Sequence, residues 1–275
     1  MLRSSTNLVI LVVLYRMAPE DSPTLQSLGD VLRRPGGFSG RVVVWDNSPD
    51  SFGADSISGL DLSGFDRSYI ACPENFGLAK VYNTVSGQVP GDLLLILDQD
   101  SMLPDGFLEI LDREVSSNPD CSLFLPVVES NGRCVSPGRL RVFKGKHVSV
   151  PQQGVRSPKD VLAISSGMVI RYGYLQQPRF DERLTLYGID TRFMIDFADN
   201  EWQLVVMPSV IRHDTALWSD MDADGMLWRI RSLIRSWPVV FERRPLARML
   251  SWMYARYVLA KLAIKYRDIR FLYVH

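Results

Sequence analysis

The sequence has few of the residues and runs that mark a secreted, zinc-binding or membrane-spanning protein. Its three cysteines, Cys72, Cys121 and Cys134, are odd in number and are not spaced as in a zinc site. The early apolar run Leu8–Leu14 is too short to cross a bilayer, and no small-residue cleavage site follows it. We therefore expect a protein of the reducing cytosol without a secretion signal, and we interpret Leu8–Leu14 as a buried strand.

Two nucleotide-binding signatures are also missing. No G-x-G-x-x-G follows an apolar run, and no Walker lysine motif occurs, so the sequence does not support dinucleotide binding or a P-loop. Net charge is absent as well, since 31 Lys and Arg balance 31 Asp and Glu. The balance hides an asymmetry, because residues 226–275 carry eleven basic side chains against Glu242 and Asp268. The remaining acidic body would repel a phosphate backbone, so we expect no nucleic-acid partner.

What is present is an ordinary globular composition, with 46% hydrophobic and 23% charged residues in a chain of 275. Continuous apolar runs, typical of strands covered on both faces, alternate with helical patterns. This alternation predicts an α/β fold with a largely parallel sheet. The predicted strands are Leu8–Leu14, Val42–Trp45 and Leu93–Leu97, and the predicted helices between them are 24–32, 78–86 and 104–116.

The later part of the chain is less regular. Asn131-Gly132 predicts a hairpin turn, and the Pro, Gly and basic residues of 136–160 indicate a mobile connection. After residue 219 the pattern is helical, with one helix that Pro238 should stop and another over 246–267. We expect two units: residues 1–219, which carry the sheet, and a basic, aromatic helical extension at 220–275.

Polar clusters follow the three strands, where ligands of such sheets collect. Asp98-Gln99-Asp100 is the most informative, because residues two apart on an extended chain point the same way. Two carboxylates on one side suit Mg²⁺ or Mn²⁺ that also takes phosphate oxygens, as in a nucleoside diphosphate complex. A bare Asp-x-Asp also occurs in solvated, helix-capping turns, but here the run Leu93–Leu97 aims the pair at the edge of the sheet.

Two weaker clusters accompany this one. Asp46 in Asp46-Asn47-Ser48 would accept hydrogen bonds from a base or a ribose, although Asp-Asn-Ser-Pro is also a good turn sequence. Asn75 and Gly77, with Asn83 further on, would either cap a helix or let a nucleotide approach the backbone closely.

Taken in order, these motifs are similar to those of a known family. An apolar strand ending in Tyr15, then Asp46-Asn47-Ser48, Asn75-x-Gly77-x-Ala79 with Asn83, and Leu97-Asp98-Gln99-Asp100-Ser101 resemble glycosyltransferase family 2 over about residues 7–215. The Asp-Gln-Asp-Ser form looks most like the bacterial rhamnosyltransferase branch. The resemblance implies a GT-A fold, which is a Rossmann-like mixed sheet flanked by helices. It also implies a nucleotide-sugar donor, a divalent metal and inversion at the anomeric carbon.

The resemblance assigns roles residue by residue. Tyr15, Asp46, Asn75, Gly77, Asn83, Asp98 and Gln99 would contact the donor, and Asp98, Asp100 and His213 would bind Mg²⁺ or Mn²⁺. Ser165-Ser166-Gly167 resembles the small-residue segment beside the acceptor site of relatives. Asp190 matches the acidic residue that deprotonates the acceptor. Relatives usually carry a second acidic residue where Arg192 stands, which leaves Asp196 and Asp199 as alternative bases, and Asp190 also suits a helix N-cap.

The basic extension has two interpretations. Its Arg, Lys, Trp and Tyr side chains would lie on anionic lipid, where an undecaprenyl-diphosphate-linked acceptor would sit. Alternatively, the aromatic faces pack on the sheet unit while the arginines stay solvated. The two are compatible, and the first predicts peripheral attachment at the inner face of the plasma membrane.

We therefore expect an inverting, metal-dependent glycosyltransferase that moves L-rhamnose from dTDP-β-L-rhamnose to a glycan or lipid-linked acceptor in bacterial surface polysaccharide (O-antigen) synthesis. One alternative is a sugar-phosphate nucleotidyltransferase, although Tyr15-Arg16-Met17-Ala18 supplies little of the glycine-rich, basic loop that triphosphate needs. The other is a non-catalytic, membrane-associated scaffold that binds nucleotide without turnover.

Overall fold

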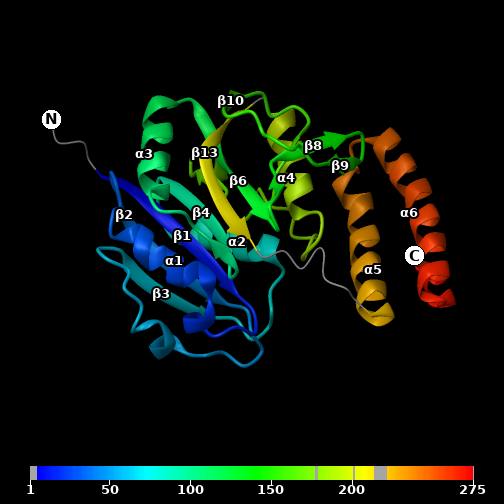
Figure 1. Cartoon of the computed structure of the whole chain (residues 1–275), viewed down its shortest axis with the longest axis horizontal. Helices are drawn as coiled ribbons and strands as arrows, with labels where there is room; N and C mark the ends of the chain where they lie inside the picture. The colour runs from blue at the N-terminus through cyan, green and yellow to red at the C-terminus, as the bar shows by residue number, and fades with distance from the viewer. Residues whose placement is uncertain (1–4, 177–178, 201, 214–221, 275) are drawn as a thin grey trace.

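The computed structural model describes residues 5–176, 179–200, 202–213 and 222–274 (Figure 1). A large mixed β-sheet forms the centre of the molecule, and helices cover it, which confirms the predicted α/β architecture (Figure 1). The strands of this sheet are β1 (Thr6–Leu14), β2 (Phe38–Asp46), β3 (Asp66–Ala71), β4 (Leu93–Asp98), β5 (Ser101–Met102), β6 (Cys121–Ser130), β7 (Arg133–Ser136), β10 (Gly154–Arg156), β12 (Val169–Arg171) and β13 (Gln203–His213). The α-helices are α1 (Pro23–Leu32), α2 (Leu78–Gln88), α3 (Phe107–Ser117), α4 (Ile189–Asp199), α5 (Ala223–Val240) and α6 (Pro245–Tyr266).

The order of the strands brings acidic strand ends to one edge of the sheet. That order is β10-β13-β6-β12-β4-β1-β2-β3, with β5 paired to β13 and β7 to β6. β1 runs parallel to β2 and β4, whereas β12 is antiparallel to β4 and β6 and so makes the sheet mixed. The register sets Leu14 beside Asp46 and Val13 beside Asp98. Both carboxylates therefore lie at the ligand-collecting edge of the sheet.

β1 is buried on both faces, which explains its unbroken apolar run. Val9, Leu11 and Val13 pack into a cluster that includes side chains of α2 and α4. Leu8 and Ile10 point the other way, into a cluster with side chains of α1 and α3. Since side chains of a strand alternate between faces, a strand covered on both sides needs an apolar residue at every position.

The segment predicted as a mobile connection is in fact partly ordered into strands. Residues 136–160 contain β8 (Gly138–Arg141) and β9 (Lys144–Lys146), which pair with each other, and β8 also pairs with β11 (Val161–Leu162). Leu140 is buried and anchors the small sheet. The strands are short and mostly exposed, so basic and glycine residues suit them and obscured the strand pattern in the sequence.

The two C-terminal helices form an antiparallel pair outside the main sheet. Figure 1 shows α5 beside α4 and α6 outermost. The prediction that Pro238 stops the first helix is wrong, since α5 continues to Val240. Pro238 removes one backbone donor, but only two helical residues follow it, and the Phe241 N–H still closes the last turn onto the Trp237 carbonyl at 2.9 Å. The predicted boundary at 219/220 lies outside the described residues and stays a prediction.

We predict that Gly188→Ala disturbs the junction between α4 and α5. Gly188 is the N-cap of α4, with φ +84°, and an added Cβ would lie 2.7 Å from Val240 Cγ2 and 2.9 Å from Ser236 Oγ. A left-handed conformation and this contact should together lower the free energy of unfolding by about 2 kcal/mol or more. Urea denaturation measures the loss.

The matched control for this change is Gly87→Ala. Gly87 lies in α2, and an added Cβ there would meet nothing within 4 Å. Removing a helical glycine should stabilise the protein by roughly 0.5–1 kcal/mol. Equal effects of the two substitutions would contradict the account of the junction.

Candidate active site

Asp98, Asp100 and His213 meet where β4, β5 and β13 converge. β4 ends at Asp98, and the short strand β5 pairs antiparallel with the end of β13, so that Ser101 faces His213. One potential ligand atom from each of Asp98, Asp100 and His213 lies within 4.8 Å of the others. His213 Nδ1 is 3.3 Å from Asp100 Oδ1. Two carboxylates and an imidazole form a donor set that fits a divalent cation such as Mn²⁺ or Mg²⁺.

The carboxylates converge for a reason other than the one that the sequence suggested. Residues 99 and 100 form a turn and not a continuing strand, so alternation along an extended chain does not apply. The turn is closed because β4 and β5 on either side of it are both held in the sheet. Between the two carboxylates, Gln99 Oε1 accepts the Tyr15 N–H at 2.7 Å.

Hydroxyl groups hold this turn in place. Ser101 Oγ lies 2.6 Å from Ser166 Oγ and 2.9 Å from His213 Nδ1. The Asp98 N–H donates to Ser166 Oγ at 3.1 Å, and the Ser101 N–H donates to Thr24 Oγ1 at 2.7 Å. The sequence assigned no role in the turn to Thr24 or Ser101 and placed Ser166 near an acceptor. The sequence signal for this role was the serine directly after the Asp-x-Asp, Ser101, which is fully buried in the structure.

The third acidic group of the site is Asp190, in the first turn of α4. Burial and the nearby Asp98 charge raise the pKa of Asp190 to about 7, although the Ser165 hydroxyl and N–H donate to it and act in the opposite sense. Tyr82, buried on α2, contacts Ser165 Oγ at 3.2 Å. Burial also raises the pKa of Asp98, and Asp100 adds to this while His213 opposes it. The site therefore gathers carboxylates that are costly to ionise together until a cation joins them.

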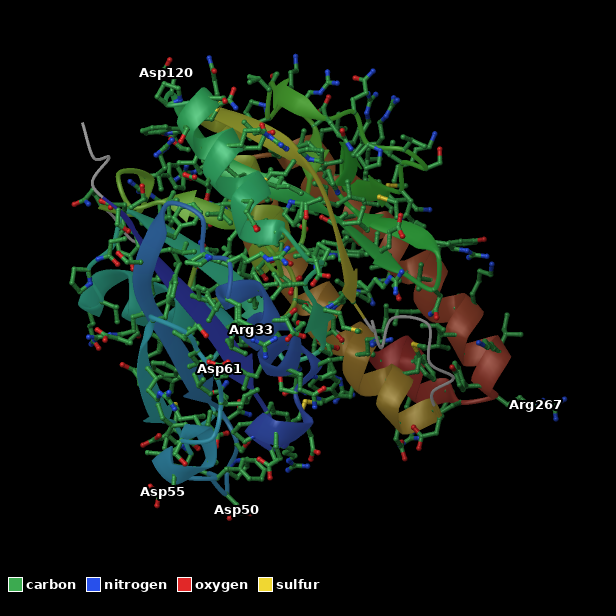
Figure 2. All side chains as sticks on the ribbon, turned by 60° about the vertical axis from the view of Figure 1, so that its left-hand side comes forward. Arg33, Asp50, Asp55, Asp61, Asp120 and Arg267 are labelled. Carbon is green, nitrogen blue, oxygen red and sulfur yellow. The ribbon has the colours of Figure 1, made fainter. Side chains whose placement is uncertain are left out.

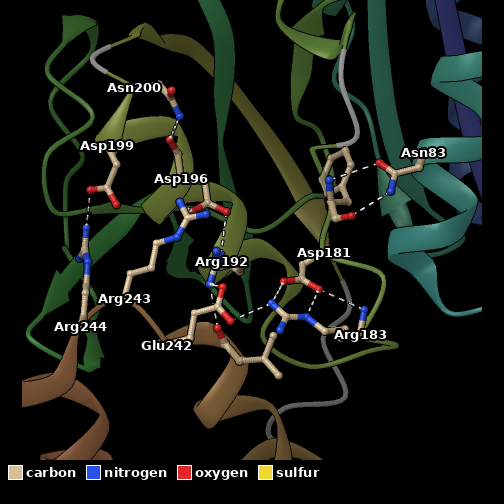
Figure 3. Close-up of polar contacts among 12 residues, drawn as sticks. Asn83, Asp181, Arg183, Arg192, Asp196, Asp199, Asn200, Glu242, Arg243 and Arg244 are labelled. Carbon is tan, nitrogen blue, oxygen red and sulfur yellow. Dashed lines mark hydrogen bonds and ion pairs between the residues drawn. The ribbon is translucent and has the colours of Figure 1, made fainter.

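The alternative bases lie elsewhere. Asp196 is 2.6 Å from Arg192 Nε, and Asp199 is 3.0 Å from Arg244, so both carboxylates are turned toward arginines (Figure 3). Arg192, which stands where relatives carry an acidic residue, is buried and also pairs with Glu242 at 2.9 Å. This network ties α4 to the end of α5 and leaves Asp190 as the carboxylate of α4 that faces the site.

Asp46 is completely buried at the same edge of the sheet. Its carboxylate accepts hydrogen bonds from the N–H groups of Ser48 (2.9 Å) and Phe52 (3.0 Å) and from the Tyr69 hydroxyl. Burial alone would raise the pKa of Asp46, but these hydrogen bonds outweigh it and lower the pKa below its ordinary value. In the structure, Asp46 thus organises the loop that follows β2.

The motif around α2 also serves contacts within the protein. An added Cβ on Gly77 would lie 2.8 Å from Thr185 Cα, so the close approach at this glycine comes from the chain itself. Asn83 donates to the Phe180 carbonyl at 2.8 Å and to Glu182 at 2.9 Å, which holds the segment leading into α4. Asn75 is exposed, with φ +51°. A donor contact for these three residues stays a prediction, whereas Tyr15 is joined to the Asp98 turn through the bond from its N–H to Gln99.

A cavity of about 800 Å³ lies far from the cluster. Arg156, Asp199, Trp202, Gln203 and Arg244 help to line it. Gln203 begins β13 and His213 ends it, so this cavity and the Asp98 cluster lie at opposite ends of the same strand. It is therefore separate from the candidate active site.

Comparisons with known proteins agree with this fold. A sequence model described as Glycosyl transferase family 2 matches residues 21–177. Among solved structures, S. aureus TarS 1-349 in complex with UDP is 16% identical, with a TM-score of 0.52, over 84% of this chain and 65% of that one. GalNAc-T7 with UDP, GalNAc and Mn²⁺ is 13% identical, with a TM-score of 0.61, over 87% of this chain and 48% of that one. Such likeness shows the fold, which is GT-A-like, and the chain spans under two thirds of either structure. A search of curated proteins found no match.

We predict that Asp190→Asn stabilises the protein in alkaline, chelator-treated buffer. A carboxyl whose folded pKa is near 7, against an ordinary 3.8, favours folding at low pH and loses this contribution as the pH rises through 7. The variant lacks this loss, so its free energy of unfolding at pH 8.5 should exceed that of the parent by up to roughly 4 kcal/mol. At pH 5.5 the advantage should be smaller. Urea denaturation at both pH values measures it.

Asp196→Asn is the control from the same helix. It removes an ion pair with the buried Arg192 and should therefore destabilise the protein at pH 8.5. If Asp190→Asn loses stability at pH 8.5 as its control does, this would contradict the claim that burial and the Asp98 charge disfavour the ionised form of Asp190.

Proposed function

This chain belongs to glycosyl transferase family 2, and we propose that it transfers a sugar from a nucleoside-diphosphate donor to an acceptor hydroxyl with inversion at C1. The observation that carries the proposal is the convergence of one ligand atom each from Asp98, Asp100 and His213 within 4.8 Å. Asp190 lies close enough to Asp98 for the Asp98 charge to raise its pKa. A cation site beside an acid of raised pKa is the pairing that single displacement of a diphosphate requires.

Asp98, Asp100 and His213 would hold the divalent metal. The mixed oxygen and nitrogen donor set suits Mn²⁺ well, and Mg²⁺ is the alternative. When bound, such an ion supplies Lewis-acid stabilisation of the charge that builds on the leaving diphosphate. The GalNAc-T7 structure, which holds UDP and Mn²⁺, supports this assignment.

Asp190 would act as the base. A carboxylate with a pKa near 7 is basic enough to accept a proton from an acceptor hydroxyl. At neutral pH about half of the molecules carry it in the ionised form that can do so. Its carboxylate takes the proton while the acceptor oxygen attacks C1 from the side opposite the diphosphate, so the anomeric configuration inverts. The hydrogen bonds from Ser165 hold the carboxylate in position for this step.

For the donor we propose dTDP-β-L-rhamnose, which would yield an α-L-rhamnoside. This choice rests on the Asp98-Gln99-Asp100-Ser101 sequence. The solved TarS structures hold UDP or UDP-GlcNAc, so UDP sugars are the competing donors. For the acceptor we propose an undecaprenyl-diphosphate-linked glycan of bacterial surface polysaccharide, reached from the cytoplasmic face of the membrane. No helix among the described residues is long and apolar enough to cross a bilayer.

A donor screen tests the proposal. The protein is incubated with dTDP-rhamnose, UDP-glucose and UDP-GlcNAc, with and without Mn²⁺, and released nucleoside diphosphate is measured. We expect Mn²⁺-dependent release, fastest from dTDP-rhamnose, and a fall of at least about 100-fold in Asp100→Asn.

The control is Asp120→Asn, because Asp120 is an exposed carboxylate. Asp50 and Asp55 follow β2 and mark the end of the molecule at which the strand ends of the site lie, and Asp120 lies at the opposite end (Figure 2). This variant should release diphosphate at the parent rate. Unchanged metal-dependent release in Asp100→Asn would contradict the metal assignment. Thermal stabilisation by nucleotide without release from any donor would indicate a binding protein instead.

A further inference from the structure

Helix α6 is packed on one side and exposed on the other. Its inner face consists of small or apolar residues spaced four apart, and these are buried: Ala247, Ser251, Ala255 and Leu259. α5 packs against α6 on the side toward the sheet, and α6 is the outermost element of the molecule (Figure 1). Nothing in the described part of the chain covers the side of α6 that faces away from α5.

The exposed side is as apolar as a buried one. At 100° per residue, six apolar side chains fall in an arc of roughly 80° that lies opposite the packed face. These residues are all exposed: Leu246, Met249, Met253, Tyr257, Ala260 and Ile264. We call this set the outer stripe. A helix that is apolar on two opposite faces is expected to be covered on both.

Cations flank the outer stripe on both sides. By the same helical angles, Arg256 lies about 20° beyond one edge of the stripe and Lys261 about 40° beyond the other, with Lys265 further round on the Lys261 side. Arg248 is exposed but lies nearer the packed face. α6 contains no Asp or Glu from Pro245 to Tyr266. Along the borders, the Arg256 guanidinium lies 5.3 Å from the Trp252 ring centre, and Lys261 Nζ lies 5.5 Å from that of Tyr257. The surface is thus an apolar strip with cations on both sides.

We propose that the outer stripe of α6 docks on an anionic lipid bilayer. The charge pattern selects this occupant over a second copy of the chain. A symmetric pairing of two such helices would bring the flanking cations of the two copies together, with no acidic residue on either helix to compensate. A bilayer with anionic headgroups satisfies both features, because the stripe enters the headgroup–acyl boundary while the cations meet phosphate.

The helix lies along the surface of the bilayer and does not cross it. α6 carries four basic residues within its 22, and none of the helices in the described part of the chain could span a bilayer. α5 separates the docking face from α4, whose first turn carries Asp190 (Figure 1). If the proposed function holds, the extension keeps the active site within reach of a lipid-linked acceptor.

Vesicle flotation with the full-length protein tests the proposal without any donor or acceptor. We expect binding to vesicles of phosphatidylcholine with phosphatidylglycerol, and weak binding to phosphatidylcholine alone. Ile264→Glu should weaken binding to the anionic vesicles at least about tenfold. It replaces an apolar side chain that docking would bury by a carboxylate that the anionic headgroups repel. Val150→Glu is the matched control, since Val150 and Ile264 are both 78% exposed and Val150 lies outside α6. It should bind as the parent does.

A second variant separates charge from apolar insertion. The double substitution Lys261→Gln and Lys265→Gln should lower binding to anionic vesicles by about fivefold for each residue and leave binding to neutral vesicles unchanged. All of these side chains are exposed, so thermal unfolding should match that of the parent.

Two results would overturn the proposal. One is parent-like binding of Ile264→Glu to anionic vesicles. The other is conversion of a dimer to a monomer by Ile264→Glu in sedimentation velocity, with vesicle binding unchanged, which would make the stripe an interface between copies. Vesicle binding by a protein that releases no diphosphate from any donor would support the docking surface while contradicting the proposed function.

Discussion

The site depends on one constraint, the pairing of β5 with the end of β13. β4 delivers Asp98 to the edge of the sheet in parallel register with β1, and the chain then turns within two residues into β5. Because Ser101 is paired with His213, Asp100 is brought 3.3 Å from the imidazole. The serine hydroxyls around this turn are buried and bonded to one another, so the three ligand candidates are positioned before any cation arrives.

The cost of this arrangement appears in the electrostatics. Asp98 and Asp190 both have raised pKa values because burial and neighbouring carboxylates disfavour their charged forms. Other acidic residues of the same region show the reverse, since Asp181, which is bonded to Arg183, has a lowered pKa (Figure 3). Among the described residues, the carboxyl groups with raised pKa values lie at the candidate active site, where the binding of a cation would stabilise their charged forms.

Much of this could be predicted from the sequence, because strand periodicity is strong and local. The runs Leu8–Leu14 and Leu93–Leu97 identify the central strands, and the Asp-x-Asp after the second identifies the metal candidates. Tertiary contacts determined the rest. Gly77 and Asn83 resembled a nucleotide motif, yet they contact Thr185 and Phe180 about a hundred residues away, and no local pattern reports such partners. The strands β8 and β9 within 136–160 were not predicted for a similar reason, because they are short and depend on pairing with each other and on the buried Leu140.

The central claim is that Asp98, Asp100 and His213 bind one divalent ion together with a nucleoside diphosphate. A crystal structure of the protein soaked with dTDP and Mn²⁺ tests it most directly, because the anomalous signal of manganese locates the ion independently of the protein. We expect one ion about 2.1 Å from a carboxylate oxygen of Asp100, with His213 and diphosphate oxygens completing its coordination. An ion bound elsewhere, or diphosphate bound in the site with both carboxylates turned away from it, would contradict the account.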